Sequence, residues 1–175
     1  YVTQIFQDSR KNIWLGTYDK GLFVDYYYKE KFGGNDSYLN RVIENSSVMS
    51  VAVDKQENLW ISTMLKGVFV YHTATQKAEQ ITIEGLPAGE QKNAINHIFC
   101  DRDGGLWLST SNIVMKARYD GQRLNILGQW PVPMAMDFEQ TDDGTVWAAS
   151  STTYIFGFHP DSSEPEVKQA FNVEI

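Results

Sequence analysis

The sequence predicts an all-β fold built from four copies of one short antiparallel sheet. The first observation is a repeat, because four segments align without a gap on Trp14, Trp60, Trp107 and Trp147, which lie 46, 47 and 40 residues apart. The second is the alternation of apolar and polar residues in short runs, which is typical of strands. The third is that no window has the caps and periodicity of an amphipathic helix. A repeat of roughly 40–47 residues with about four short strands is the pattern of a β-propeller blade.

Each repeat begins with a strand and a tight turn. Six residues before the tryptophan stand Asp8, Asp54, Asp101 and Thr141, and two residues before it stand Asn12, Asn58, Gly105 and Thr145. An Asp or Thr side chain accepts hydrogen bonds from turn amides, while Asn and Gly tolerate positive φ. We therefore expect a hairpin turn that the aspartate caps, with the positive φ two residues before the tryptophan.

The tryptophan strand and a third strand complete the recognisable part of each repeat. Small residues follow the tryptophan, as in Gly16-Thr17 and Ser62-Thr63, and a second apolar run comes after a loop. An aromatic ring closes the run twelve residues past the tryptophan, at Tyr26, His72, Tyr119 and His159. A weaker fourth strand fits segments such as 77–83 and 122–127. We expect each tryptophan to fill the wedge between adjacent blades.

The whole chain, 1–175, is expected to be a β-propeller fragment with blades at about 1–40, 47–84, 94–128 and 134–175. Four blades in an open arc would leave an apolar face at each end, which invites association. We expect part of a larger ring, or a ring completed by a second chain, with a closed four-bladed ring as the alternative. The tail, 166–175, is expected to be the outer strand of the fourth blade or the start of another. Because the first residue is Tyr1, we expect a piece of a longer protein.

Composition excludes several classes of function. Hydrophobic residues make up 42% and charged residues 21%, which suits a packed core. The net charge of −7 argues against binding to nucleic acid or to an anionic membrane surface. No run approaches the roughly 20 apolar residues of a membrane helix. The single cysteine, Cys100, excludes an intrachain disulfide and a cysteine-rich zinc site. We expect no cofactor and no metal.

The repeats resemble the two-component regulator propeller repeat, whose consensus runs roughly I-x-x-D-x-x-G-x-[IL]-W-[IL]-G-T-x-x-x-G-L. The first repeat, IFQDSRKNIWLGTYDKGLFVDY, matches it nearly throughout. The second keeps Asp54, Trp60, Thr63 and Gly67, the third has Val114 in place of the glycine, and the fourth keeps only the turn and Trp147. The sialidase-type Asp-box shares the geometry of the turn, but its Ser or Thr before the Asp is poorly matched here.

The resemblance implies a periplasmic sensor module of a bacterial hybrid two-component histidine kinase. Such repeats form paired seven-bladed propellers, so the four blades would belong to a seven-bladed ring in a full-length homodimer. A membrane helix and kinase, receiver and DNA-binding domains usually follow, and many of these sensors respond to oligosaccharides. Kinase activity and membrane attachment would then belong to other parts of the full-length chain. Alternatives are an interaction scaffold and a lyase resembling the streptogramin-cleaving type, which needs a His and an acid at a metal.

Ligand binding is expected on loops that vary between the repeats, since a rigid scaffold carries its specificity there. The candidate ligand-binding residues are Tyr18, Lys20, Lys66, His97, Ser111, Asn112 and Trp130. His97 shares a first-strand column with Gln4, Ser50 and Asp137 that could face the central channel. Trp130 lies outside the repeat, before Pro131 and Pro133, and is either a sugar platform or a plug between the third and fourth blades.

Other residues that suggest chemistry have a structural interpretation. His72 and His159 occupy one repeat column, so a ring would hold them apart and aromatic packing is expected. The repeated Asp8, Asp54 and Asp101 are expected to cap turns, and Cys100 to be a buried inert thiol. The run 26–28 of three tyrosines is either a packing surface or a sugar platform. No catalytic residue is expected.

Overall fold

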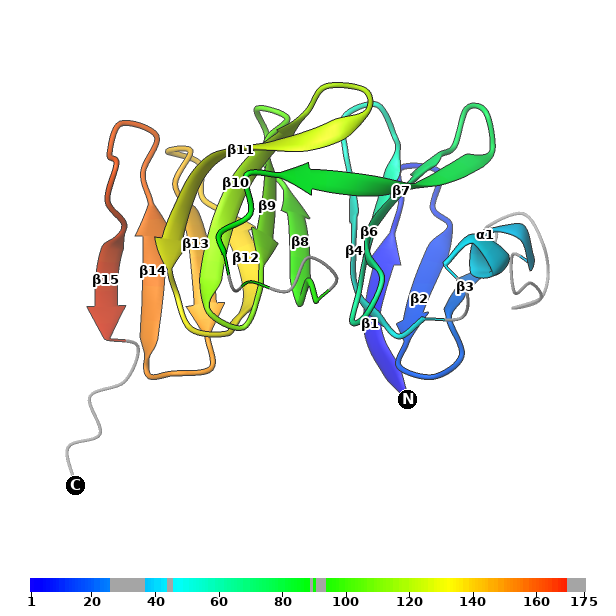
Figure 1. Cartoon of the computed structure of the whole chain (residues 1–175), viewed down its shortest axis with the longest axis horizontal. Helices are drawn as coiled ribbons and strands as arrows, with labels where there is room; N and C mark the ends of the chain where they lie inside the picture. Colours follow the sequence, from blue (N-terminus) through cyan, green and yellow to red (C-terminus); the bar gives the residue numbers. More distant parts are fainter. Residues whose placement is uncertain (26–36, 44–45, 89, 91–93, 170–175) are drawn as a thin grey trace.

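The computed structural model describes residues 1–25, 37–43, 46–88, 90 and 94–169, and it has the all-β fold of propeller blades (Figure 1). Its strands are β1 (Val2–Gln7), β2 (Ile13–Thr17), β3 (Leu22–Asp25), β4 (Val48–Val53), β5 (Leu59–Thr63), β6 (Gly67–His72), β7 (Lys77–Glu84), β8 (His97–Cys100), β9 (Leu106–Ser109), β10 (Ile113–Tyr119), β11 (Arg123–Pro131), β12 (Ala135–Gln140), β13 (Val146–Ser150), β14 (Tyr154–Phe158) and β15 (Glu166–Gln169). A short helix, α1 (Ser37–Val42), follows the first sheet.

The strands form four consecutive antiparallel units that succeed one another from the blue to the red end of the chain (Figure 1). The first is β1-β2-β3 and the last is β12-β13-β14-β15. Between them, β4 to β7 and β8 to β11 join into one eight-stranded sheet. Because β15 pairs with β14, the described part of the tail is the outer strand of the fourth unit. The first strands, β1, β4, β8 and β12, each stand at one edge of their unit and contact their neighbours.

The junction inside the eight-stranded sheet departs from the expected pattern. Strand β7 crosses from the second unit toward the third and pairs in parallel with β11 (Figure 1). The paired residues are Thr82 with Arg123, Ile83 with Leu124 and Glu84 with Asn125. The repeat predicts only antiparallel pairing within a blade, because the crossing depends on contacts between two different repeats.

The expected position of the positive φ is wrong by one residue. Lys11, Glu57, Gly104 and Gly144 have φ of 67°, 62°, 81° and 86°, and each stands three residues before its tryptophan. In the first repeat the next residue, Asn12, donates its N–H to Asp8 Oδ1 at 2.9 Å and already belongs to the end of the turn. The reversal of the chain therefore falls on the preceding residue.

The gap-free alignment is also wrong after Trp107. Trp14, Trp60 and Trp147 pair with the residue ten positions later on the third strand, whereas Trp107 pairs with Lys116, nine positions later. The loop of the third repeat is thus one residue shorter. Tyr119 lies against the second unit: its hydroxyl donates to the Glu79 carboxylate that also contacts His72, and its ring meets Trp60 edge-on at 5.0 Å. Residues 26–28, with Tyr26 of the same column, lie outside the described residues.

The sequence pattern did not predict the helix α1. Its six residues are too few to show helical periodicity. Leu39 and Ile43 are fully buried and pack in one cluster with Trp14, so tertiary contacts stabilise this segment. In the described part of the chain, no helix has the length and apolar composition needed to cross a membrane.

The hydrophobic core lies between the blades. In the first cluster, Trp14 lies with Val51, Leu59 and Ile61 of the second unit. In the next, Trp60 lies with Ile98 and Leu106 of the third unit. In the last, Trp107 lies with Phe138, Val146 and Phe158 of the fourth unit. Trp147 is half-buried, and its ring lies beneath the Lys168 ammonium at 4.6 Å. Each tryptophan of the first three units is therefore buried by the unit that follows it.

Candidate functional site

The repeated aspartates hold the hairpin turns together. Asp8, Asp54 and Asp101 each accept backbone N–H groups of the turn on Oδ1, and the indole N–H of their own tryptophan on Oδ2 at 2.9–3.0 Å. Burial opposes ionisation of Asp101, but the hydrogen bonds from Trp107 and Gly105 and the nearby Lys116 ammonium outweigh it and lower the pKa of the carboxyl. These carboxylates therefore stabilise the turn and hold the tryptophan ring in place.

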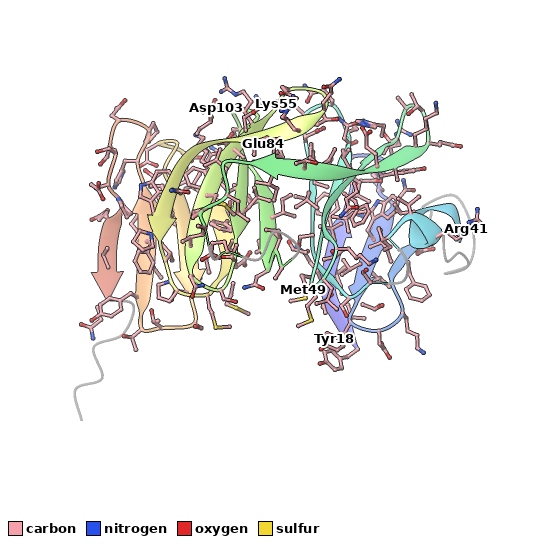
Figure 2. The ribbon with its side chains drawn as sticks, in the orientation of Figure 1. Tyr18, Arg41, Met49, Lys55, Glu84 and Asp103 are labelled. Atoms are coloured by element: carbon pink, nitrogen blue, oxygen red, sulfur yellow. The ribbon has the colours of Figure 1, made fainter. Side chains whose placement is uncertain are left out.

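A pocket of about 600 Å³ lies on the face opposite the hairpin turns. Figure 2 shows Met49 and Tyr18 on this face, while Lys55 and Asp103 of the hairpin turns lie on the other side of the molecule. The strand residues that line the pocket are Val2, Thr3, Gln4, Met49, His97, Met136 and Asp137, and the loop residues are Tyr1, Met64, Asn96, Ser111 and Met134. We call it the methionine pocket, because four of the five methionines of the chain line it.

Irregular pairing at the start of the first strands forms the pocket wall. The register shifts between Val2 and Gln4 in β1, between Val48 and Ser50 in β4, and between Ala135 and Asp137 in β12. The intervening residues, Thr3, Met49 and Met136, all line the pocket. A β-bulge re-aims a side chain, and bulges are common beside functional sites. The same irregularity in the first strand thus places a side chain in the pocket wall in three of the repeats.

Backbone hydrogen bonds bring the loops to the same place. The N–H of Tyr18 donates to the carbonyl of Tyr1 at 3.0 Å, that of Met64 to Ser47 at 3.1 Å and that of Ser151 to Met134 at 3.0 Å. In each case the loop after the tryptophan strand is tied to the beginning of the first strand. Met134 has a φ of 42°, and its N–H donates to the carbonyl of Ser111 at 2.9 Å. The loop positions are therefore fixed by the backbone.

His97 and Asp137 form the polar end of the methionine pocket. His97 Nε2 lies 3.3 Å from Asp137 Oδ1, and the side chains are 13% and 75% exposed. Burial lowers the pKa of His97, although the Asp137 carboxylate acts in the opposite direction. Burial therefore outweighs the neighbouring carboxylate at the imidazole, and the side chain of Asp137 is the exposed member of the pair.

The structure brings only some of the predicted site residues together. His97 and Ser111 line the methionine pocket, and Tyr18 stands at its rim, where its ring stacks on Tyr1 at 5.3 Å and its hydroxyl lies 3.9 Å from Met64 Sδ. Lys20 and Lys66 lie in equivalent loops, where their backbone N–H groups donate to Thr17 and Thr63, and they are not among the lining residues.

Asn112 also stands apart from the pocket lining. Its side-chain amide donates to Glu90 Oε1 at 3.1 Å. The sequence interpretation missed the methionines, although a signal was present. Met49 and Met136 both stand eleven residues before their tryptophan, and Met64 stands in the column of Tyr18 and Ser111.

Trp130 packs between the third and fourth units. It belongs to strand β11, whereas the candidate ligand-binding residues were expected in loops. Its ring stacks on Trp107 at 5.7 Å, lies 4.9 Å from Phe158, and donates its N–H to the carbonyl of Ser163 at 2.8 Å. These contacts with both neighbouring units agree with the plug interpretation, and the ring remains partly exposed.

The other two histidines and the cysteine lie outside the methionine pocket. His72 bridges Asn58 and Glu79, and His159 bridges Thr145 and Glu166, each within its own unit. Cys100 is only partly buried, and burial, followed by Asp54 and Asp101, raises the pKa of its thiol. Among the described residues, no three His, Cys, Asp or Glu side chains are grouped so that they could hold a metal ion.

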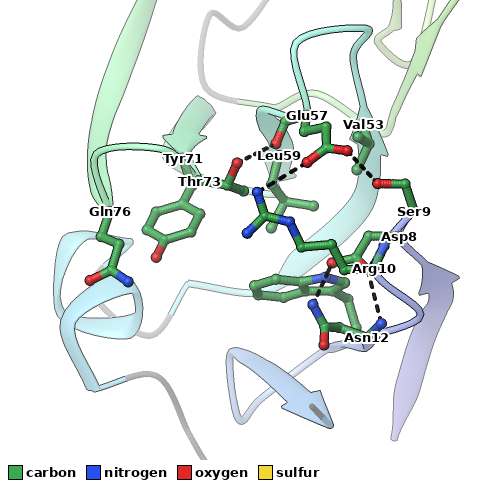
Figure 3. Close-up of a pocket in the computed structure, with 11 residues that line it drawn as sticks. Asp8, Ser9, Arg10, Asn12, Val53, Glu57, Leu59, Tyr71, Thr73 and Gln76 are labelled. Atoms are coloured by element: carbon green, nitrogen blue, oxygen red, sulfur yellow. Dashed lines mark hydrogen bonds and ion pairs between the residues drawn. The ribbon is translucent and has the colours of Figure 1, made fainter. Parts of the chain in front are cut away.

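A smaller groove lies on the hairpin face between the first and second units (Figure 3). Arg10 reaches Glu57 Oε2 at 3.1 Å, and Ser9 donates to the same carboxylate at 2.5 Å. Thr73 donates to the backbone carbonyl of Glu57 at 2.9 Å. The polar groups of this groove therefore bind one another, and they serve to join two neighbouring turns.

Comparisons with known proteins agree with this architecture. The family profile described as the two component regulator propeller matches residues 1–19 and 89–112. The matched segments lie in the first repeat and around the first strand of the third. Among solved structures, the extracellular domain of a hybrid two component system, BT3049 of B. thetaiotaomicron, is 24% identical with a TM-score of 0.71, over 96% of this chain and 23% of that one.

Two further solved structures have the same fold. The extracellular domain of the one component system BT4673 of B. thetaiotaomicron is 21% identical with a TM-score of 0.73, over 97% of this chain and 25% of that one. Virginiamycin B lyase of Staphylococcus aureus is 11% identical with a TM-score of 0.67, over 96% of this chain and 54% of the lyase chain. The chain spans about a quarter of the length of each of the two B. thetaiotaomicron domains. No curated protein matches it.

Proposed function

We propose that this chain is a ligand-recognition part of the extracytoplasmic sensor region of a two-component signal-transduction protein. The observation that carries the proposal is the methionine pocket, which recurrent bulges and loops from all four units form on one face. The fold similarity to extracellular domains of B. thetaiotaomicron signalling proteins supports the extracytoplasmic location. Signal transmission, including any kinase activity, would belong to other parts of the full-length protein, and the role proposed for this chain is binding without catalysis.

The expected oligosaccharide ligand is the finer part of the proposal. The stacked Tyr1 and Tyr18 rings at the rim could carry the apolar face of a sugar, and Ser111 could bind its hydroxyl groups.

The sensor role is tested in the full-length protein that contains this chain, with a transcriptional reporter. Ser111→Trp fills the methionine pocket and is expected to abolish ligand-dependent output at unchanged protein abundance. Gln122→Trp, in an exposed turn on the opposite side of the sheet, is the matched control. Unchanged output from Ser111→Trp would refute the role of this pocket.

The expected oligosaccharide ligand is tested separately, by calorimetric titration of the chain with neutral and acidic oligosaccharides. Absence of binding to all of them would reject the oligosaccharide part of the proposal.

An interaction scaffold is the second candidate, and the exposed end of the arc favours it. Ile5 is 67% exposed, whereas Val51, Ile98 and Phe138 in the same repeat column are 2%, 1% and 4% exposed. We propose that further blades or a second copy cover this face, as in the homodimer expected for the full-length protein. A chain that stays monomeric at high concentration in sedimentation would argue against the second copy.

A further inference from the structure

The methionines of this chain are concentrated in one exposed place. Met64, Met134 and Met136 are 36%, 43% and 55% exposed, and Met49 lines the same pocket. The fifth methionine, Met115, is fully buried in the core between the second and third units. Exposed apolar side chains gathered on one face mark a binding site more often than isolated ones do. The thioether groups thus form the apolar wall of the pocket.

The backbone holds these side chains in place at a local cost. Met49 and Met136 sit at bulges, and Met134 has a left-handed φ of 42°. A residue that is not glycine adopts such a conformation at a cost of about 1–3 kcal/mol, and strain of this kind is found preferentially at binding sites. Hydrogen bonds at both the N–H and the carbonyl of Met134 keep it there. The backbone positions from which the wall projects are therefore fixed by the fold.

The chemistry of the wall suits an aromatic group. Methionine is unbranched and polarisable, and its sulfur makes favourable contacts at the edge of aromatic rings. At the rim, Met64 Sδ already accepts a hydrogen bond from the Tyr18 hydroxyl at 3.9 Å. A pocket of about 600 Å³ is within the range that encloses small organic ligands.

The polar end of the pocket carries negative charge. Asp137 is 75% exposed beside His97, whose pKa is lowered by burial. Of the described residues that line the pocket, none is Lys or Arg. The net charge of the whole chain, −7, has the same sign. A cationic group is therefore favoured over an anionic one at Asp137.

We propose that the methionine pocket binds small amphipathic cations, with an aromatic ring against the four methionines and a protonated amine at Asp137. The inference rests on the proposed function only in taking this pocket as a ligand site. It is independent of the oligosaccharide at the rim and of any signalling output.

The experiment uses the chain with 13C-labelled methionine methyl groups and three probes. Phenethylamine carries ring and charge, 3-phenylpropionate carries the ring with the opposite charge, and ethylamine carries the charge alone. Phenethylamine is expected to shift the methyl resonances of Met49, Met64, Met134 and Met136 and to leave that of Met115 unchanged. Its affinity is expected to exceed that of either other probe at least about tenfold.

Asp137→Asn tests the charge, and Met136→Lys tests the wall with a cation placed next to it. Both are expected to weaken phenethylamine binding about tenfold or more, while Asp137→Asn leaves 3-phenylpropionate binding unchanged or stronger. An unchanged Met115 resonance verifies the fold of each variant.

Absence of shifts at the four methionines would overturn the proposal, as would equal affinity for the anion or unchanged binding by Asp137→Asn. None of these outcomes affects the reporter test of the sensor role, so the two proposals fail separately.

Discussion

At the scale of single residues, one carboxylate connects the turn to the blade interface. Asp101 is 4% exposed, and its two oxygens accept the N–H groups of Asp103, Gly105 and the Trp107 indole. The Lys116 ammonium lies 3.3 Å away and over the Trp107 ring at 5.1 Å. A buried donor that loses its acceptor keeps its full desolvation cost. The aspartate thus stabilises the turn and orients the tryptophan that fills the wedge.

Asp101→Ala is expected to lower the free energy of unfolding by about 3 kcal/mol, because it leaves a buried indole N–H and two turn amides without their acceptor. Urea unfolding followed by tryptophan fluorescence measures the change. Asp103→Ala, an exposed position in the same turn, is the control and should stay within about 0.5 kcal/mol of the wild type. Equal effects of the two substitutions would show that the turn, and not the buried carboxylate, matters.

At the scale of elements, the crossing of β7 onto β11 joins two blades into one sheet. Ile83 is 6% exposed and packs in the core cluster with Leu124, its pairing partner, and with Trp60. Arg123 and Glu84 add an ion pair at 3.3 Å on the surface. Exposed ion pairs contribute little to stability, so the apolar contact below the strands stabilises the junction more than the ion pair does.

Ile83→Ala is expected to destabilise the fold by about 2–4 kcal/mol, since it leaves a cavity at the junction of two blades. Thr82→Ala, one residue earlier in the same parallel pair but exposed, should change stability by no more than about 0.5 kcal/mol. Chemical denaturation compares the two. If both substitutions were neutral, the crossing strand would not be packed on the core as described.

At the scale of the whole molecule, successive units share one mode of packing. The tryptophan of each of the first three units covers the first-strand apolar residue of the next, so Val51, Ile98 and Phe138 are almost inaccessible. In the described residues no preceding unit covers the equivalent Ile5. The same column of the repeat is thus core at three places and surface at the fourth.

Lysine substitutions at two residues of this column, one buried and one exposed, test whether the packing between units determines their effect on stability. Val51→Lys buries an unpaired ammonium against Trp14 and should cost about 4 kcal/mol or more, or prevent folding. Ile5→Lys should remain within about 1 kcal/mol of the wild type, because its side chain faces solvent. Thermal unfolding of the purified variants provides the comparison. A large loss of stability on Ile5→Lys would mean that this face is covered in solution.

The site was less predictable than the fold, and particular residues show why. His97 and Ser111 were found because first-strand and loop columns point to one face of a propeller. Lys20 and Lys66 stand in those same columns but do not line the pocket, because spacing places a residue in a loop without fixing where its side chain points. Trp130 was ambiguous for a related reason, since its partners Trp107 and Phe158 come from two different repeats.

The sequence by itself determined the repeated unit: strand alternation, an aspartate-capped turn and a tryptophan are local features that recur along the chain. Only the tertiary structure decided the parallel crossing of β7 and β11, the shorter loop after Trp107, and the gathering of four methionines around His97 and Asp137. Each of these depends on contacts between residues tens of positions apart. A local pattern encodes hydrogen bonds within a turn or strand pair, but the geometry between units is set by how their side chains pack.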